Sequence, residues 1–248
     1  MKRDEKRYAL LLACKDSEYV KKVHGGYFNV FVKAFGEEGE RWDLFRVIEG
    51  EFPDFEDLQN YDGFIVSGSP HDAYANDFWI LRLCDLLQTL FALHKRLLGI
   101  CFGHQVLCRA LGGKVGKACR GWDIGITKLI MVESSFWYKY LQEENQMVPH
   151  LPSILECHQD EVWDVPLGAE VIAFSEKTRV EMFAFGDHIL GIQGHPEYTK
   201  DILYNLIERL VGNDSIQRDY GEDLKSRLEK LEPDRKFWEM ICKSFLKG

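Results

Sequence analysis

The sequence predicts an α/β protein with an open, mostly parallel sheet flanked by helices and with extra antiparallel strands in its second half. Three observations support this fold class. Apolar runs rich in β-forming residues alternate with stretches of helical periodicity up to about residue 110. After residue 120 the apolar runs become shorter, and few helices separate them. Three of the runs end at small or reactive residues, which is typical of ligand sites at the carboxyl ends of strands in open α/β sheets.

The first half of the chain supplies the parallel strands. Its β-rich apolar runs lie at residues 8–14, 42–48, 63–66 and 96–100. Helical periodicity is clearest at residues 78–94, between the last two of these strands. A short helix is expected at residues 104–111, because Gly112 and Gly113 follow it as a stop signal. Parallel strands need such crossover connections, so the alternation favours a parallel sheet.

The second half is expected to extend the sheet or to form a mixed sheet beside it. Its shorter predicted strands lie at residues 124–132, 153–157, 170–174, 180–185 and 188–193, and a helix follows at residues 199–210. The tail, residues 214–248, combines many charges with interleaved apolar residues. This pattern predicts two amphipathic helices divided at Pro233. We expect them to pack against the protein's own sheet, and a partner interface is the alternative.

Length and charge indicate a single domain that does not bind nucleic acid. With 248 residues, we expect one domain over residues 1–248 whose core runs from about residue 8 to about residue 210. The 31 basic and 40 acidic residues give a formal charge of −9, and no basic block is dense enough to neutralise many phosphates. The composition also argues against a membrane-spanning protein.

The start of the chain and the cysteines indicate a cytosolic location. The apolar run at residues 8–14 is short and lacks a small-residue cleavage site, so it is interpreted as a buried strand and not as a signal peptide. The seven cysteines include no CxxC pair, and their number is odd. Free thiols in a reducing compartment are therefore expected.

One cysteine stands at a predicted corner between a strand and a helix. In "LLGICFGHQ", Cys101 follows the apolar run and is flanked by Gly99 and Gly103. A helix start favours thiolate over thiol, and the amide of Phe102 would face an oxyanion formed on an attacked carbonyl. Gln105, one helical turn later, shares the face of Cys101 and is a candidate for binding substrate. The alternative is that Cys101 is a small buried hydrophobe in a glycine-rich turn.

Two other strand ends supply candidate partners for this thiol. His195 follows the run 188–193 and is a candidate base, which Glu197 could orient. The same "HPE" could instead be only a helix start with an acid in its first turn. Gly68, in "SGSP" after the run 63–66, could present a second amide to an oxyanion, or could be a plain turn.

The triple "SGSP", "GICFGHQ" and "GHPEY", in this order, resembles the class I (triad) glutamine amidotransferase family. This resemblance implies a flavodoxin-like fold with Cys101 as nucleophile, His195 as general base and acid, and Glu197 as the residue that orients it. It also implies an oxyanion hole formed by the amides of Gly68 and Phe102. Gln105 is expected to contribute to the pocket for the γ-glutamyl group.

Further stretches, among them "WDLFRVIEG", "SGSPHDAY", "CHQDEV" and "IQGHPEY", look like the plant γ-glutamyl peptidases, a free-standing branch of that family. The branch implies hydrolysis of glutathione and its S-conjugates through a glutamyl thioester, in glucosinolate and related sulfur-compound biosynthesis, with no cofactor and no obligate synthase partner. Two alternatives stay open. One is a glutaminase subunit that supplies ammonia to a separate synthase, and the other is a catalytically inactive small-molecule binder.

Three further residues are candidates for contact with the substrate. In "ECHQDEV", His158 and Asp160 share one face of a predicted strand, and the resemblance suggests a substrate-binding or supporting role for His158. No further ligands lie at usable spacing, so no metal site is expected. In "CRGWDIGI", Arg120 and Asp123 could meet the α-carboxylate and the α-amine of a γ-glutamyl group, or could be an ordinary exposed pair.

Overall fold

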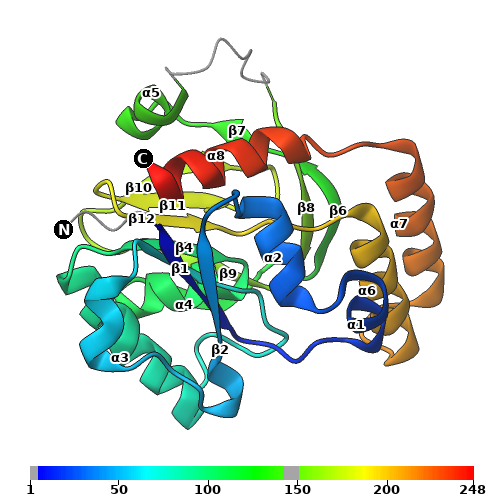
Figure 1. Ribbon diagram of the computed structural model, residues 1–248. Helices are drawn as coiled ribbons and strands as arrows, with labels where there is room; N and C mark the ends of the chain where they lie inside the picture. The colour runs from blue at the N-terminus through cyan, green and yellow to red at the C-terminus, as the bar shows by residue number, and fades with distance from the viewer. Residues whose placement is uncertain (1–4, 142–150) are drawn as a thin grey trace.

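The computed structural model describes residues 5–141 and 151–248. Its centre is an eight-stranded sheet in the order β2-β1-β3-β4-β12-β11-β10-β7 (Figure 1). The first five strands of this order are parallel, and the last three run antiparallel to their neighbours. The bounds of the strands in this sheet, in chain order, are β1 Arg7–Leu12, β2 Arg41–Arg46, β3 Gly63–Val66, β4 Arg96–Ile100, β7 Ile130–Met131, β10 Glu170–Phe174, β11 Met182–Phe185 and β12 Ile189–Ile192. The predicted fold class is confirmed.

Helices cover both faces of the sheet. Their bounds are α1 Glu18–His24, α2 Tyr27–Phe35, α3 Phe78–Ala92, α4 Phe102–Ala110, α5 Ser135–Leu141, α6 Lys200–Gly212, α7 Arg218–Lys230 and α8 Arg235–Lys247. Short 3₁₀ helices occupy Val47–Glu49 and Phe55–Asn60. Helices α3 and α4 lie on one face, and α2 and α8 lie on the other (Figure 1).

Strand β1 shows why the sheet is covered on both sides. Its residues are almost all apolar, so side chains on both of its faces must be buried. Leu10 and Leu12 pack in the core shared with α2 and α8, whereas Ala9 and Leu11 pack in the core shared with α3 and α4. This division follows from the two-residue period of a strand.

The second half departs from a simple extension of the sheet. Strands β7, β10 and β11 do extend it, but two separate two-stranded sheets form beside it. One pairs β5 (Lys114–Lys117) with β9 (Asp160–Asp164), and the other pairs β6 (Asp123–Lys128) with β8 (Ser153–His158). The single strand expected at residues 124–132 is therefore two strands, β6 and β7, which belong to different sheets. Strand β5 was not predicted. The single strand expected to hold both His158 and Asp160 is also wrong, because His158 ends β8 and Asp160 begins β9 in another sheet.

The tail forms α7 and α8, on either side of Pro233. Trp238 and Phe245 of α8 are fully buried in the core that α2 and the sheet share. The indole Nε1 of Trp238 donates a hydrogen bond of 2.8 Å to the carbonyl of Ser153, which fixes α8 against β8. In the part of the chain that the structure describes, no helix combines the length and the apolar character that crossing a bilayer requires.

Candidate active site

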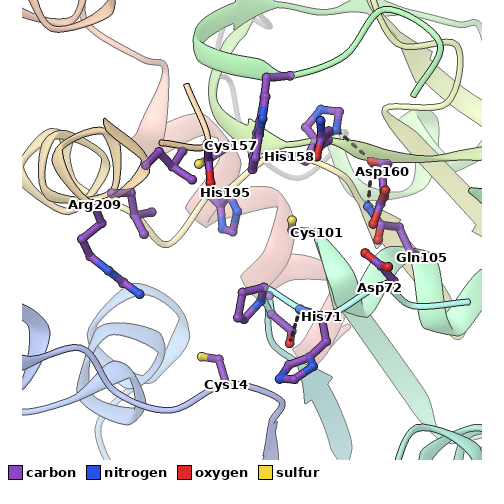
Figure 2. Close-up of a pocket in the computed structure, with 18 of the residues that line it drawn as sticks. Cys14, His71, Asp72, Cys101, Gln105, Cys157, His158, Asp160, His195 and Arg209 are labelled. Atoms are coloured by element: carbon purple, nitrogen blue, oxygen red, sulfur yellow. Dashed lines mark hydrogen bonds between the residues drawn. The ribbon is translucent and has the colours of Figure 1, made fainter. Parts of the chain in front are cut away.

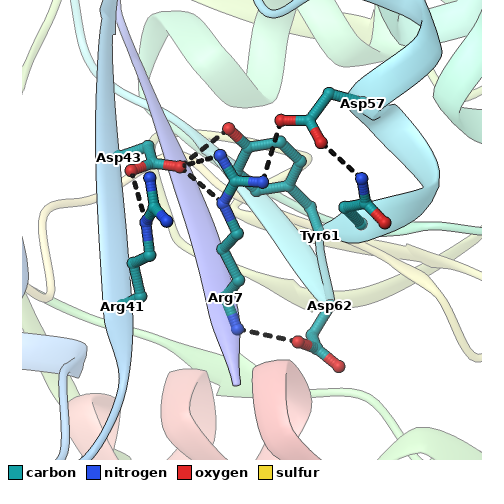
Figure 3. A network of polar contacts seen from close by, with 7 residues as sticks. Arg7, Arg41, Asp43, Asp57, Tyr61 and Asp62 are labelled. Carbon is teal, nitrogen blue, oxygen red and sulfur yellow. Dashed lines mark hydrogen bonds and ion pairs between the residues drawn. The ribbon is translucent and has the colours of Figure 1, made fainter. Parts of the chain in front are cut away.

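Three neighbouring strands bring the candidate residues together. Strands β3, β4 and β12 are adjacent and parallel, so their carboxyl ends lie at one edge of the sheet. Gly68 follows β3, Cys101 follows β4 and His195 follows β12. The three residues line one cavity, with Cys101 and His195 near its centre (Figure 2). The sheet order thus joins segments that are far apart in the sequence.

Cys101 is held in a strained backbone conformation at the start of α4. Its φ of 52° and ψ of −106° lie in a region that side-chain-bearing residues rarely occupy. The turn is tight because glycines stand on both sides. A β-carbon at Gly99 would lie 2.5 Å from the carbonyl oxygen of Gly103, and one at Gly103 would lie 2.2 Å from that of Val66. The two glycines therefore allow α4 to approach β3 and β4 closely enough to form this corner.

The imidazole of His195 is fixed from two directions. Its Nδ1 lies 2.8 Å from Oε1 of Glu197, and its ring stacks on Tyr198 with centroids 4.0 Å apart and an interplanar angle of 4°. A carboxylate oxygen accepts hydrogen bonds, so Nδ1 carries the proton and Nε2 is the atom free for proton transfer. The backbone N–H of His195 donates to the carbonyl of Leu155 at 2.8 Å, which attaches the segment to β8.

The charges of Glu197 and Cys101 oppose the effect of burial on the pKa of His195. Burial alone would lower the pKa of His195, but its interactions with Glu197 and Cys101 outweigh burial and raise the pKa to about 10. An imidazolium is therefore favoured at neutral pH. Burial raises the pKa of the Cys101 thiol, and the neighbouring His195 acts against that rise. The charged form of His195 is thus favoured, and its charge lessens the cost of ionising the Cys101 thiol.

Gly68 lies against both members of this pair. A β-carbon there would be 3.0 Å from Cε1 of His195 and 3.6 Å from Cβ of Cys101. Any side chain at this position would press on the imidazole. Phe102 is the first residue of α4, where backbone N–H groups have no acceptor within the helix. Its ring stacks on Trp79, with centroids 5.6 Å apart.

The cavity has a volume of about 400 Å³ and extends to both sides of Cys101. On one side lie Gln105, Asp72 and Asp160, and on the side of His195 lies Arg209 of α6 (Figure 2). Nε2 of Gln105 donates to the carbonyl of Asp160 at 2.9 Å and to Oε1 of Gln193 at 3.1 Å. These bonds hold the Gln105 side chain at the wall of the cavity.

The sequence of the chain matches a known protein family and known relatives. The family model described as "Glutamine amidotransferase class-I" matches residues 23–204. The chain belongs to the class I glutamine amidotransferase family. Two curated relatives from Arabidopsis thaliana are similar over nearly their whole length. Gamma-glutamyl peptidase 5 is 52% identical over 100% of this chain and 98% of the relative, and gamma-glutamyl peptidase 3 is 49% identical over 98% of each.

Solved structures of glutamine amidotransferases share the fold. A glutamine amidotransferase from Thermotoga maritima superposes with a TM-score of 0.73 at 21% identity, over 98% of this chain and 99% of that chain. One from Methylobacillus flagellatus gives a TM-score of 0.70 at 18% identity, over 98% of this chain and 94% of that chain. At these identities the likeness concerns the fold alone.

His158 lines the amidotransferase cavity from the end of β8. It is buried, and its Nδ1 donates to the carbonyl of Asp160 at 2.9 Å. Burial lowers its pKa to about 4, so the ring is neutral and its Nε2 lone pair faces Oε2 of Glu156 at 3.5 Å. Ligand atoms of Glu156, His158 and Glu181 lie within 4.8 Å of one another, so the three residues could hold a metal ion, although no metal site was expected from the sequence.

Arg120 and Asp123 are not among the residues that line the cavity. Arg120 is exposed and donates to the carbonyl of Glu176 at 2.6 Å. Asp123 is buried, with Oδ1 3.8 Å from Nζ of Lys177. The structure therefore does not bring this pair to the same place as Cys101. Their contact with substrate stays a prediction.

Several residues of the cavity were not singled out from the sequence. Asp72 follows the "SGSP" stretch, so its closeness in sequence to Gly68 was a usable signal. Cys14 ends the apolar run 8–14, so its place at the end of a parallel strand was a usable signal as well. Arg209 had no such signal, because its place depends on how α6 packs around the cavity. The aromatic side chains of Tyr27 and Trp122 also line the cavity.

Proposed function

We propose that this protein is a cysteine-dependent γ-glutamyl peptidase that hydrolyses the γ-glutamyl bond of glutathione and of glutathione S-conjugates. The observation that carries the proposal is the buried His195, which is hydrogen-bonded to Glu197 and lies beside Cys101 in the cavity. The similarity to gamma-glutamyl peptidases over the whole chain supports the choice of bond. Glutamate and a cysteinyl peptide would be the products.

The first half of the reaction is acylation of Cys101. The thiolate attacks the γ-carbonyl carbon, and the carbonyl oxygen becomes an oxyanion that the amides of Gly68 and Phe102 would stabilise. The C–N bond then breaks, and the imidazolium of His195 donates its Nε2 proton to the departing amine. The raised pKa of His195 supports this role, because it keeps the proton available at neutral pH.

The second half releases glutamate. His195 is neutral after it has given up its proton, so it can remove a proton from an incoming water molecule. The resulting hydroxide attacks the thioester carbonyl, the C–S bond breaks, and the Cys101 thiolate leaves. His195 is then an imidazolium again, as at the start. Glu197 holds the same tautomer throughout, because Nδ1 never loses its hydrogen-bond acceptor.

The test compares three substrates. Purified protein is incubated with glutathione, with an S-conjugate of glutathione and with glutamine, and the release of glutamate and of the cysteinylglycine product is measured. Hydrolysis of the two peptides by this protein alone, with no synthase added, supports the proposal. Activity on glutamine alone, and only after a synthase is added, would identify a glutaminase subunit instead. The place in glucosinolate and sulfur-compound biosynthesis and the cytosolic location stay predictions.

A further inference from the structure

The cavity carries opposite charges at its two ends. Asp72 and Asp160 lie at one end, on the far side of Cys101 from His195 (Figure 2). Lys117 also lines the cavity, and its charge lowers the pKa of Asp160, although burial and Asp72 raise that pKa to about 6 overall. At the other end stands the cation Arg209 (Figure 2), and Lys15 also lines the cavity.

Arg209 is an exposed cation at the His195 end of the cavity. Within residues 5–141 and 151–248, no hydrogen bond or ion pair is found for its guanidinium group. Its charge is close enough to act on Cys14, Tyr27 and Cys157, which all line the cavity. Figure 2 shows the side chain extending from α6 towards the cavity. An unpaired guanidinium in this position is available to an anionic group of a ligand.

The chemistry of the proposed function determines which part of the substrate reaches the Arg209 end of the cavity. The departing amine must lie beside His195, because that side chain supplies its proton. The peptide that leaves with the amine therefore extends towards the His195 side of the cavity, where Arg209 lies (Figure 2). The γ-glutamyl group, with its α-ammonium, then occupies the side of Asp72 and Asp160.

We propose that Arg209 binds the C-terminal carboxylate of the leaving peptide and so makes the enzyme select γ-glutamyl peptides with a free carboxyl end. This assignment rests on the proposed function. A guanidinium and a carboxylate can form two parallel hydrogen bonds, which favours this group over a neutral amide. Tyr27 and Leu206 border the same part of the cavity and offer apolar surface to the rest of the leaving peptide.

The experiment measures kcat and KM for glutathione and for its C-terminal amide, with wild-type protein and Arg209→Gln. The wild type is expected to prefer the free acid. Arg209→Gln should raise KM for glutathione about 10- to 100-fold, as expected for the loss of a charged hydrogen bond, while kcat changes little. KM for the amide should stay within about twofold of the wild type, and Arg209→Lys should recover part of the preference.

Arg179→Gln is the matched control, because it removes an exposed arginine that does not line the cavity. It should leave both KM values unchanged. Three results would overturn the assignment and leave the proposed function intact. They are an equal rise of KM for both substrates in Arg209→Gln, no rise of KM for either substrate in that variant, and the same rise of KM in Arg179→Gln. A wild type that cleaves neither peptide would overturn the proposed function and this assignment together.

Discussion

Nδ1 of His195 lies 2.8 Å from Oε1 of Glu197, and both side chains are buried, 4% and 1% exposed. A carboxylate this close to an imidazole in a site without bulk water strongly favours the charged ring. The contact therefore sets both the tautomer and the protonation state of the group that would move protons at Cys101.

Replacing Glu197 by Gln should lower activity and move its pH dependence. The amide keeps a hydrogen-bond acceptor but removes the charge, so the pKa of His195 should fall from about 10 towards its ordinary value. The imidazolium would then be lost at lower pH, and the alkaline limb of kcat/KM should shift to lower pH. A loss of about 10²- to 10⁴-fold is expected at neutral pH. An unchanged pH–rate profile would remove Glu197 from this role.

Replacing Cys101 by Ala should remove hydrolysis of γ-glutamyl peptides, with a loss of about 10⁴-fold or more. The fold should persist, because the change removes only a sulfur atom and leaves the backbone of the corner intact. Far-ultraviolet circular dichroism and a urea titration check this point. Cys119→Ala is the matched control, since Cys119 is exposed and does not line the cavity. Equal rates of hydrolysis in wild type and Cys101→Ala would refute the proposed mechanism.

Gly103→Ala should destabilise the protein by about 3 kcal/mol, because the new methyl group would lie 2.2 Å from the carbonyl oxygen of Val66. Helix α4 would have to move away from β3, and activity should fall as Cys101 moves with it. Gly212→Ala is the control, since a β-carbon there meets no atom within 4 Å. It should leave the free energy of unfolding unchanged or raise it slightly. Similar losses in the two variants would contradict the close approach of α4 and β3.

The stability of the protein should fall with rising pH in a way that depends on Glu181. Burial raises its pKa from 4.5 to about 8, so the folded state retains a proton that the unfolded chain releases above pH 4.5. The contribution of this group is therefore complete below pH 4.5 and is lost as the pH rises through about 8. Glu181→Gln should remove this part of the pH dependence. Urea titrations at several pH values test it, and parallel curves for the two proteins would refute it.

Much of the fold and of the candidate site followed from local patterns. The strands that became β1, β3, β4 and β12 were visible as short apolar runs, because a strand buried on both faces needs apolar residues at successive positions. The unusual residues after β3, β4 and β12 were equally visible. The carboxyl ends of parallel strands meet at one edge, so their convergence could be predicted before the strand order was known.

Other features left no such signal. Strand β5 is short and partly exposed, with charged residues at both ends, so neither period nor composition distinguishes it from a loop. The same holds for the division of residues 124–132 between two sheets, which depends on pairing with β8 and β10. Pairing partners are distant in sequence, and nothing local records them.

The sequence by itself determined the fold class, the glycine-flanked corner at Cys101 and the candidate partners His195 and Glu197, because period, turn chemistry and spacing are properties of neighbouring residues. Only the tertiary structure decided that Arg209 stands at one end of the cavity and Asp160 at the other. Those places depend on how α6 and β9 pack around the sheet edge. Packing joins residues through space and leaves no regular interval along the chain.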